Sequence, residues 1–345
     1  MQSPRVAFLF LLYLITLFRN SVLAESKHGE NHAATFKEGC CMELLQRKEW
    51  RILSDGEKIA YTNAIKCLMS LPAQNPAFSE AKTRFDEFQA LHVHLADNIH
   101  RVGQFLPWHR QFLLSYERAL RNECEYQGAT PYWDWSLDSR NISASPIWDP
   151  VTGFGGNGVP GTYTVPKNVN YTENLIFPEA FVGCVMDGPF ANYTVRLGPG
   201  FLQTNHCLTR GIDQSYSVHI TYEAVARTLH LPTFEQFRLE LEGGAAAHKM
   251  HDGGHYMVGG EMSNFYSSPA DPLFFVHHAT LDRIWWNWQQ MVPSRLTEVS
   301  GYSTYEPPFS NITLDFELRL GSVGLSVPIR KVMDIHKAPN CYTYV

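Results

Sequence analysis

Apolar residues recur at intervals of three and four along four stretches of the chain, 53–71, 78–91, 104–120 and 272–291. This spacing gathers them on one face of an α-helix and therefore predicts four helices. The last two stretches predict buried helices, and Pro272 stands where the first turn of a helix accepts proline. The pattern as a whole predicts a mainly α-helical protein.

Residues 141–171 break this pattern, because glycine, proline and other turn-forming residues occur throughout them. We expect a surface loop here. The glycine-rich run 153–158 does not fit a phosphate-binding loop, since it follows no clear strand and lacks the Lys-Ser/Thr pair of that motif.

The first 24 residues have the order of a secretory signal peptide: Arg5, an apolar run from Val6 to Phe18, and small residues before a cleavage point after Ala24. The apolar run is too short to span a bilayer core of about 30 Å. We therefore predict residues 1–24 as a signal peptide and 25–345 as a single domain with no separate C-terminal lid. The protein would be secreted, with no membrane partner after cleavage.

Seven cysteines fit an oxidising compartment, and their odd number leaves at least one unpaired. A bridge from the Cys40-Cys41 pair to Cys341 would tie the two ends of the chain together. Four N-glycosylation sequons, which begin at Asn141, Asn170, Asn192 and Asn311, fit the same secreted setting.

The formal charge of the chain is −6, and it becomes more negative when Arg5 and Arg19 leave with the signal peptide. A negative chain without a basic cluster argues against a nucleic-acid or anionic-membrane partner. Nothing in the sequence defines the oligomeric state.

Histidines form a first cluster around the third apolar stretch. His100 and His109 are nine residues apart, which would place them on opposite sides of one helix, and Pro107 favours a helix that begins just before His109. We therefore expect His100 in a loop and His109 in a helix. Either His92 or His94 could supply a third ligand if the chain turns before His100, and Asp97-Asn98 is a plausible break.

A second cluster has simpler spacing. His251 and His255 are four residues apart and so share one helix face, while His278 comes from the last apolar stretch. His248 lies on the same face as the first two, and His277 points about 100° away from His278. Two all-histidine sites suit copper, zinc, iron or nickel rather than magnesium or calcium.

The residues between these histidines also match a known pattern. Residues 100–117 and 271–282, the latter reading Asp-Pro-x-Phe-Phe-x-x-His-x-x-x-Asp, resemble the two signature motifs of the tyrosinase superfamily of type-3 binuclear copper proteins. Stretches 130–135, 255–260 and 264–267 also resemble this family. The resemblance covers roughly residues 85–290, and it is closest to secreted fungal short tyrosinases and catechol oxidases.

The resemblance implies a four-helix bundle, two helices for each copper ion, wrapped by long loops and minor β-structure. It favours His92 over His94. It implies two copper ions as cofactor, with copper A held by His92, His100 and His109 and copper B by His251, His255 and His278.

The family implies an oxidase that uses O2 and small phenols, converting o-diphenols to o-quinones while O2 is reduced to water. Monophenols and o-aminophenols are further candidate substrates. Phe265, thirteen residues before His278, stands where catechol oxidases place a gating ring. Glu242 matches the family's water-holding glutamate, but Asp252 replaces the asparagine that accompanies it, which favours diphenol oxidation over hydroxylation. Asn98 replaces the cysteine that forms a thioether in fungal tyrosinases.

Three further expectations concern the surroundings of the clusters. Arg110 and Asp282 each follow a ligand on a buried helix, and we expect them to pair because an unpaired buried charge is costly. Glu117 would occupy a similar buried position. The tryptophans are expected to be core residues; they are Trp108, Trp133, Trp135, Trp285 and Trp286.

Three other functions compete with a catechol oxidase. A tyrosinase would add full monophenol hydroxylase activity. A haemocyanin-like oxygen carrier shares the copper site, but the segment after Trp288 is short for the β-rich domain that shields it. A zinc hydrolase is disfavoured because no glutamate follows His251 as in a His-Glu-x-x-His helix.

Overall fold

The computed structural model describes residues 41–244 and 247–345, all within the unit Glu38–Val345. The predicted signal peptide, residues 1–24, lies outside the described residues, and so do the predicted start of the domain at residue 25 and Cys40. Among the residues described, no helix has both the length and the apolar character needed to cross a membrane.

The four predicted helices are present, and the prediction of a mainly α-helical fold is confirmed. They are α1 (Asp55–Ser70), α2 (Arg84–Ile99), α3 (Phe105–Glu123) and α7 (Leu273–Met291). The ends of α2 were predicted wrongly as 78 and 91. Thr83 caps the helix through the amide of Asp86, and Asp86 accepts from the Thr83 amide in return, so the helix begins only at Arg84.

The far end of α2 was missed because residues 94–98 include three exposed polar residues, His94, Asp97 and Asn98, and give no continuous apolar signal. The chain turns after Ile99 rather than at Asp97-Asn98, and His100 caps the helix with extended backbone angles. His100 therefore lies at the start of a loop, as predicted.

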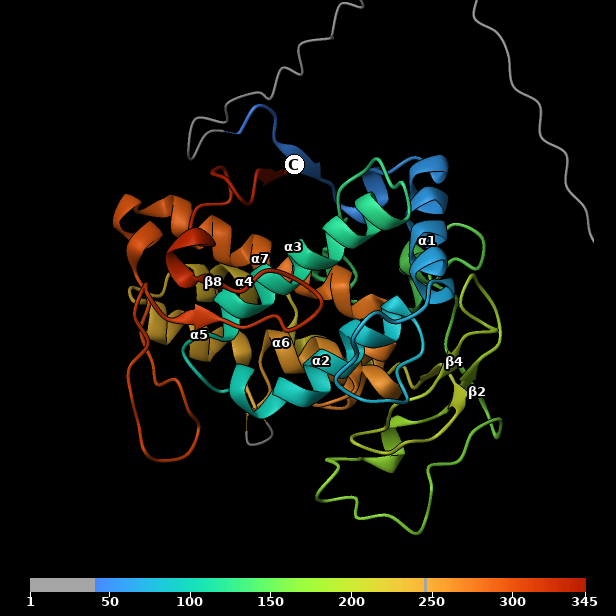
Figure 1. Ribbon diagram of the computed structural model, residues 1–345. Coiled ribbons are helices and arrows are strands. Elements are labelled where there is room, and N and C mark those ends of the chain that lie inside the picture. Colours follow the sequence, from blue (N-terminus) through green and yellow to red (C-terminus); the bar gives the residue numbers. More distant parts are fainter. Residues whose placement is uncertain (1–40, 245–246) are drawn as a thin grey trace, which may run out of the picture. The chain divides into compact units, whose positions relative to one another are not determined.

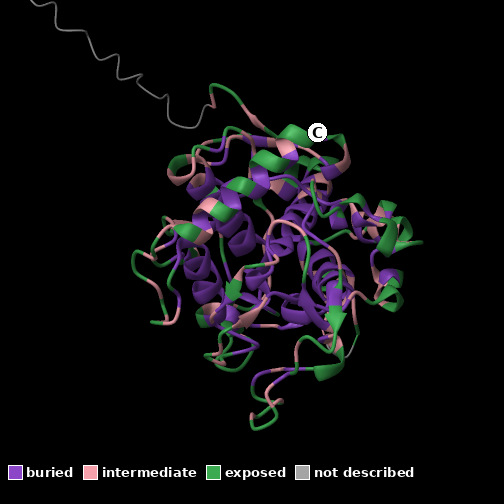
Figure 2. Ribbon diagram, turned by 90° about the vertical axis from the view of Figure 1, so that its right-hand side faces the viewer, coloured by how far each residue is buried: buried purple, intermediate pink, exposed green. Residues whose placement is uncertain are grey.

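Three shorter helices complete the core: α4 (Tyr222–Leu229), α5 (Phe234–Glu242) and α6 (Met250–Val258). In Figure 1, α2, α3, α6 and α7 gather in the centre, with α1 to one side. Figure 2 shows that buried residues fill these central helices, whereas exposed residues concentrate in the outer loops. The central helices form the bundle that the resemblance implied.

The β-structure is minor and consists of short ladders at the periphery. One sheet has three strands, in the order β2 (Gly158–Pro160), β3 (Gly183–Val185) and β6 (Thr209–Arg210). The other strands form pairs: β1 (Leu45–Arg47) with β9 (Tyr342–Tyr344), β4 (Thr194–Val195) with β5 (His206–Cys207), and β7 (Glu317–Leu318) with β8 (Val327–Pro328).

The segment 141–171 is only partly the surface loop that was predicted. Ile142, Ile147, Trp148 and Phe154 are buried in the main hydrophobic cluster. Its glycines and prolines make turns, while the apolar residues between them anchor the segment to the bundle.

Both ends of the described chain are fixed to each other. Strand β9 runs parallel to β1, and a disulfide joins Cys41 to Cys341, which confirms the bridge predicted from the Cys40-Cys41 pair. Two further disulfides, Cys67–Cys124 and Cys184–Cys207, hold peripheral segments. Three disulfides fit an oxidising compartment.

Candidate binuclear metal centre

Six histidines converge inside the helical bundle in two buried groups. His92 comes from α2, His100 from the end of that helix and His109 from α3, while the second group contains His251, His255 and His278 from α6 and α7. Within each group the candidate ligand atoms lie within 4.8 Å of one another. The structure brings His92 to the first group and leaves His94 exposed.

Main-chain carbonyls fix the orientation of five of these rings. The Nδ1–H of His92 donates to the carbonyl of Tyr266 at 2.8 Å, and that of His255 donates to Met262 at the same distance. The corresponding acceptors for His100, His109 and His251 are the carbonyls of Ala96, Phe105 and Glu242. A ring that donates through Nδ1 keeps a lone pair on Nε2, which is the form that binds a metal.

Three of the six Nε2 atoms are buried and have no partner in the described part of the chain. Those of His92, His109 and His251 have no hydrogen-bond partner among the described residues, and the Nε2 of His255 lies 3.2 Å from that of His278. Burial lowers the pKa of His92 to about 3 and that of His255 to about 4, so both rings are neutral at ordinary pH. These rings therefore fit a bound cation.

The two groups lie close to each other. The rings of His109 and His278 stack with centroids 4.4 Å apart, and those of His100 and His251 are 5.7 Å apart. The bundle therefore brings two three-histidine sites side by side, which is the arrangement of a binuclear centre.

His277 packs against the second histidine group without belonging to it. Its position in the sequence did not reveal this role. Its Nε2 lies 3.1 Å from the main-chain carbonyl of His251, and its Nδ1 accepts from the indole of Trp135 at 3.1 Å. Gly254 allows this packing, because a Cβ there would lie 2.4 Å from the His277 ring. His277 therefore links α7 to α6 without pointing at the metal site.

A small cavity opens beside the two histidine groups. The residues that line it include His100, His251 and His255 together with all three of the predicted substrate-side residues, Glu242, Asp252 and Phe265. The half-buried ring of Phe265 lies 4.6 Å from that of His100, between centroids. The structure thus gathers the three predicted substrate-side residues around one cavity, together with three of the six candidate ligands.

Both carboxylates at this cavity are already engaged by other groups. Glu242 accepts from the Arg101 amide and, at 2.7 Å, from Arg238; burial raises its pKa to about 7 although Arg238 opposes the shift. Asp252 lies 2.5 Å from the ring of His248 and accepts from main-chain amides. Arg238 was not among the predicted site residues, although its position four residues before Glu242 is the spacing of a helical ion pair.

The predicted pair between Arg110 and Asp282 is confirmed, with Nε to Oδ1 at 2.5 Å. The structure adds Arg47, which contacts both Asp282 and the buried Glu117 at 3.4 and 3.0 Å. Tyr342 and Tyr344 of β9 each donate a hydroxyl to Asp282 at 2.6 Å. The five tryptophans are all buried, as expected.

The fold and the paired histidine sites define a binuclear metalloprotein of the four-helix type. Comparison with known proteins identifies which one: residues 82–291 match the family model described as the common central domain of tyrosinase. The chain belongs to the tyrosinase family, and it is an oxidase whose cofactor is a pair of copper ions.

Individual relatives agree with this assignment. The chain is 37% identical to tyrosinase-like protein phomQ1 of Diaporthe leptostromiformis, over 88% of this chain and 78% of the relative. It is 35% identical to tyrosinase ustQ of Aspergillus flavus, over 99% and 89%. A solved structure, a mutant polyphenol oxidase from Thermothelomyces thermophila, matches with a TM-score of 0.80 and 34% identity, covering 89% of this chain and 91% of that one.

Proposed function

We propose that this protein is a secreted catechol oxidase that converts o-diphenols to o-quinones and reduces O2 to water. His92, His100 and His109 hold copper A, and the three histidines of α6 and α7 hold copper B. The observation that carries this proposal is the common orientation of the rings: carbonyls hold Nδ1, which leaves buried Nε2 lone pairs for the metal.

A copper pair held by these six histidines would supply the redox chemistry that carries electrons from the substrate to dioxygen. Each o-diphenol loses two electrons and two protons, so two diphenols convert one O2 to two waters. The protein's own contribution is to keep six imidazoles neutral and fixed in place, since burial lowers their pKa values and so disfavours their protonation.

The cavity beside the histidines supplies the substrate site. The ring of Phe265 forms one wall and packs against His100, so a phenol that enters must pass this ring. Arg101 also contacts Phe265, with its guanidinium carbon 5.4 Å from the ring centroid. These contacts support the role of Phe265 as a gate.

Monophenol hydroxylation requires a group that accepts the phenol proton. The two candidates are Glu242 and Asp252, and each has both carboxylate oxygens in hydrogen bonds with protein groups. This arrangement favours diphenol oxidation. A tyrosinase with full hydroxylase activity is the second candidate, because the relatives include a protein named tyrosinase and Glu242 lines the cavity.

Secretion is part of the proposal. It is supported by the signal-peptide pattern of residues 1–24 and by three disulfides, which persist in oxidising compartments. N-terminal sequencing of protein recovered from the culture medium should give a chain that begins at Glu25.

Oxygen uptake by the copper-loaded protein tests the activity. We expect uptake with catechol and little or none with the monophenol tyramine. Uptake with both substrates at comparable rates would make the protein a tyrosinase. Reversible oxygen binding without consumption of either phenol would replace the enzyme with an oxygen carrier.

A further inference from the structure

A second cavity adjoins the substrate cavity and has no part in the function proposed so far. Its volume is about 470 Å³, whereas that of the substrate cavity is about 80 Å³. The two cavities share two lining residues, Phe177 and Tyr256. A molecule that fills the smaller cavity with a phenol ring could therefore extend past these two side chains into the larger one.

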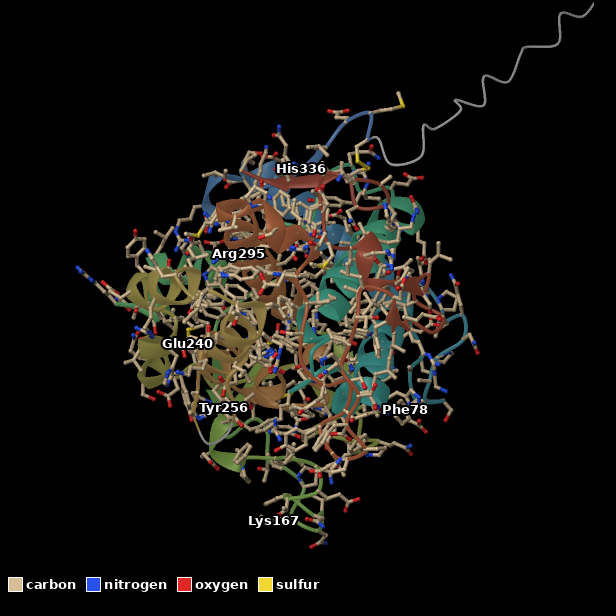
Figure 3. All side chains as sticks on the ribbon, turned by 90° about the vertical axis from the view of Figure 1, so that its left-hand side faces the viewer. Phe78, Lys167, Glu240, Tyr256, Arg295 and His336 are labelled. Atoms are coloured by element: carbon tan, nitrogen blue, oxygen red, sulfur yellow. A yellow bond between two sulfur atoms is a disulfide. The ribbon has the colours of Figure 1, made fainter. Side chains whose placement is uncertain are left out.

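Aromatic rings form the walls of this second cavity. Tyr216, from the short 3-10 helix Gln214–His219, stacks on Tyr256 of α6 with centroids 5.3 Å apart and ring planes at 23°. Phe177 meets Tyr256 edge-on at 5.7 Å. In the view of Figure 3, Tyr256 lies between Glu240 and the segment that carries Lys167. The aromatic walls offer π-faces to a cation or to another apolar group.

The charged groups at this cavity are mainly acidic. Glu179 and Asp213 line it, both are exposed, and neither forms an ion pair within the described part of the chain. The nearby basic groups are already paired: His248 with Asp252 at 2.5 Å, and Lys249 with Glu240 at 2.7 Å. Among the described residues that line it, the cavity therefore presents two carboxylates without an ion-pair partner and no unpaired Lys or Arg. Asp213 also accepts from the amide of Ser215 at 2.8 Å, which fixes the position of its side chain.

The position of Tyr216 shows that these carboxylates act on the same space. Its pKa is raised, first by burial and then by the negative charges of Asp213, Glu179 and Asp252. Charges on three separate segments therefore meet at one aromatic ring. A positive ligand group placed there would gain from the unpaired charges of Glu179 and Asp213, whereas a phosphate or carboxylate would be repelled.

We propose that this acidic aromatic cavity, lined by Phe177, Glu179, Asp213, Tyr216 and Tyr256, binds a cationic group that the phenolic substrate carries on a flexible tether. The preferred substrates are then o-diphenols with an ammonium group beyond the reach of the small cavity. The o-diphenol ring of the substrate is taken from the proposed function, on which this inference rests. Binding of a cation in this cavity can be tested separately.

The test uses a series of catechols that carry an amine on alkyl chains of two, four and six carbons, each beside its neutral N-acetyl counterpart. We expect the ratio of kcat/KM for amine over acetamide to be near one for the shortest tether. For a longer tether it should rise by about three- to tenfold, in keeping with one cation–π contact and exposed charge pairs.

Variants identify the groups responsible. The double variant Glu179→Gln/Asp213→Asn should return the ratio to near one, and Tyr216→Leu should lower it without a change of charge. A matched control, Glu43→Gln/Glu125→Gln, removes the same charge from two exposed residues outside the cavity lining and should keep the full ratio. Equal loss in the control would show that net charge, and not this cavity, causes the preference, and would overturn the proposal.

Two other results would also overturn it: a ratio near one at every tether length, or a preference confined to the shortest amine, which would place the cation in the substrate cavity. Binding of the non-oxidisable 3,4-dimethoxyphenyl analogues, followed by tryptophan fluorescence, tests the cation site separately from the proposed oxidase function. If catechol is not oxidised but the long amine analogue binds more tightly than its acetamide, the proposed function fails and the cation site stands.

Discussion

At the scale of single residues, the histidine rings of the metal centre depend on main-chain carbonyls and not on side-chain partners. Tyr266 and Met262, for example, hold His92 and His255 through their backbone oxygens. A substitution of Tyr266 or Met262 changes the side chain but keeps the main-chain carbonyl. We therefore expect the histidine ring to keep its orientation. The sensitive positions are therefore the histidines themselves.

The first prediction concerns these ligands. His109→Ala or His278→Ala should reduce the bound copper from two ions to one per chain and abolish oxidase activity, because each removes one of three donors from a site. Metal analysis of purified protein together with oxygen uptake with catechol checks this. His94→Ala is the control, since His94 is exposed and outside both groups. Normal copper and activity in the ligand variants would refute the assignment.

A second prediction concerns His206, a nearly buried residue away from the metal centre. Its Nε2 lies 2.6 Å from Glu261. Burial opposes protonation, but the hydrogen bond and the charge of Glu261 outweigh it and raise the pKa of His206. Protonated His206 therefore stabilises the fold fully below its unfolded pKa of about 6.5, and the contribution disappears as pH rises through the higher folded pKa.

Urea unfolding of the wild type and of His206→Gln across pH 5.5 to about 9 measures this effect. Glutamine can still donate to Glu261 but does not titrate. The free energy of unfolding should differ most at the acidic end, with the wild type more stable, and the difference should shrink toward alkaline pH. Parallel stability curves would contradict the prediction.

At the scale of elements, the contact between α6 and α7 depends on a glycine. Gly254 meets the ring of His277, and that ring in turn contacts the main-chain carbonyl of His251. Two ligands on α6 therefore have positions set by how closely the two helices approach.

Gly254→Ala should accordingly disturb the second copper site. The added methyl group would lie 2.4 Å from the His277 ring and force the helices apart. We expect a loss of about 1–3 kcal/mol in stability from overpacking and a weaker affinity for the second copper ion, measured by urea unfolding and by copper titration. Gly56→Ala is the control: it lies in α1 with nothing within 4 Å, and it should be neutral or stabilising.

The sequence predicted these elements well where the apolar spacing was continuous. Helices α3 and α7 begin within one residue of the predicted starts, because Pro107 and Pro272 mark their first turns. The prediction failed at α2, where the capping pair Thr83 and Asp86 stands inside the predicted helix. Spacing alone does not show which of two competing starts carries a cap.

For the site, local patterns were predictable from the sequence, whereas contacts between distant segments were not. Histidine spacing and motif resemblance placed all six candidate ligands, since both are local patterns. The partners that come from distant segments were not predictable, because only the tertiary fold brings Arg47 to Asp282 or Trp135 to His277. The cavity with Tyr216 and Glu179 belongs to this second kind.

At the scale of the described part of the molecule, one buried charge cluster connects strands β1 and β9 to two helices of the metal centre. Asp282 lies four residues after His278 on α7 and contacts Arg110 on α3, Arg47 on β1 and two tyrosines on β9. The guanidinium of Arg47 also lies 3.6 Å over the ring of Tyr342. A single carboxylate therefore joins two of the ligand-bearing helices, α3 and α7, to strands β1 and β9.

The final prediction tests this connection through Asp282→Asn. An amide accepts fewer hydrogen bonds and carries no charge, so Arg110 would lose its carboxylate partner while it stays fully buried. Arg47 would keep Glu117 as its remaining carboxylate partner. Removal of one partner from a buried ion pair costs about 3–5 kcal/mol. Asp315→Asn breaks a mostly exposed pair with Arg330 and should cost no more than about 1 kcal/mol. Urea unfolding gives both values.

Because β9 loses its anchor, limited proteolysis should also cut the C-terminal segment of Asp282→Asn first. If both variants lost equally little stability, the cluster would not hold strands β1 and β9 to the bundle, and the prediction would be wrong.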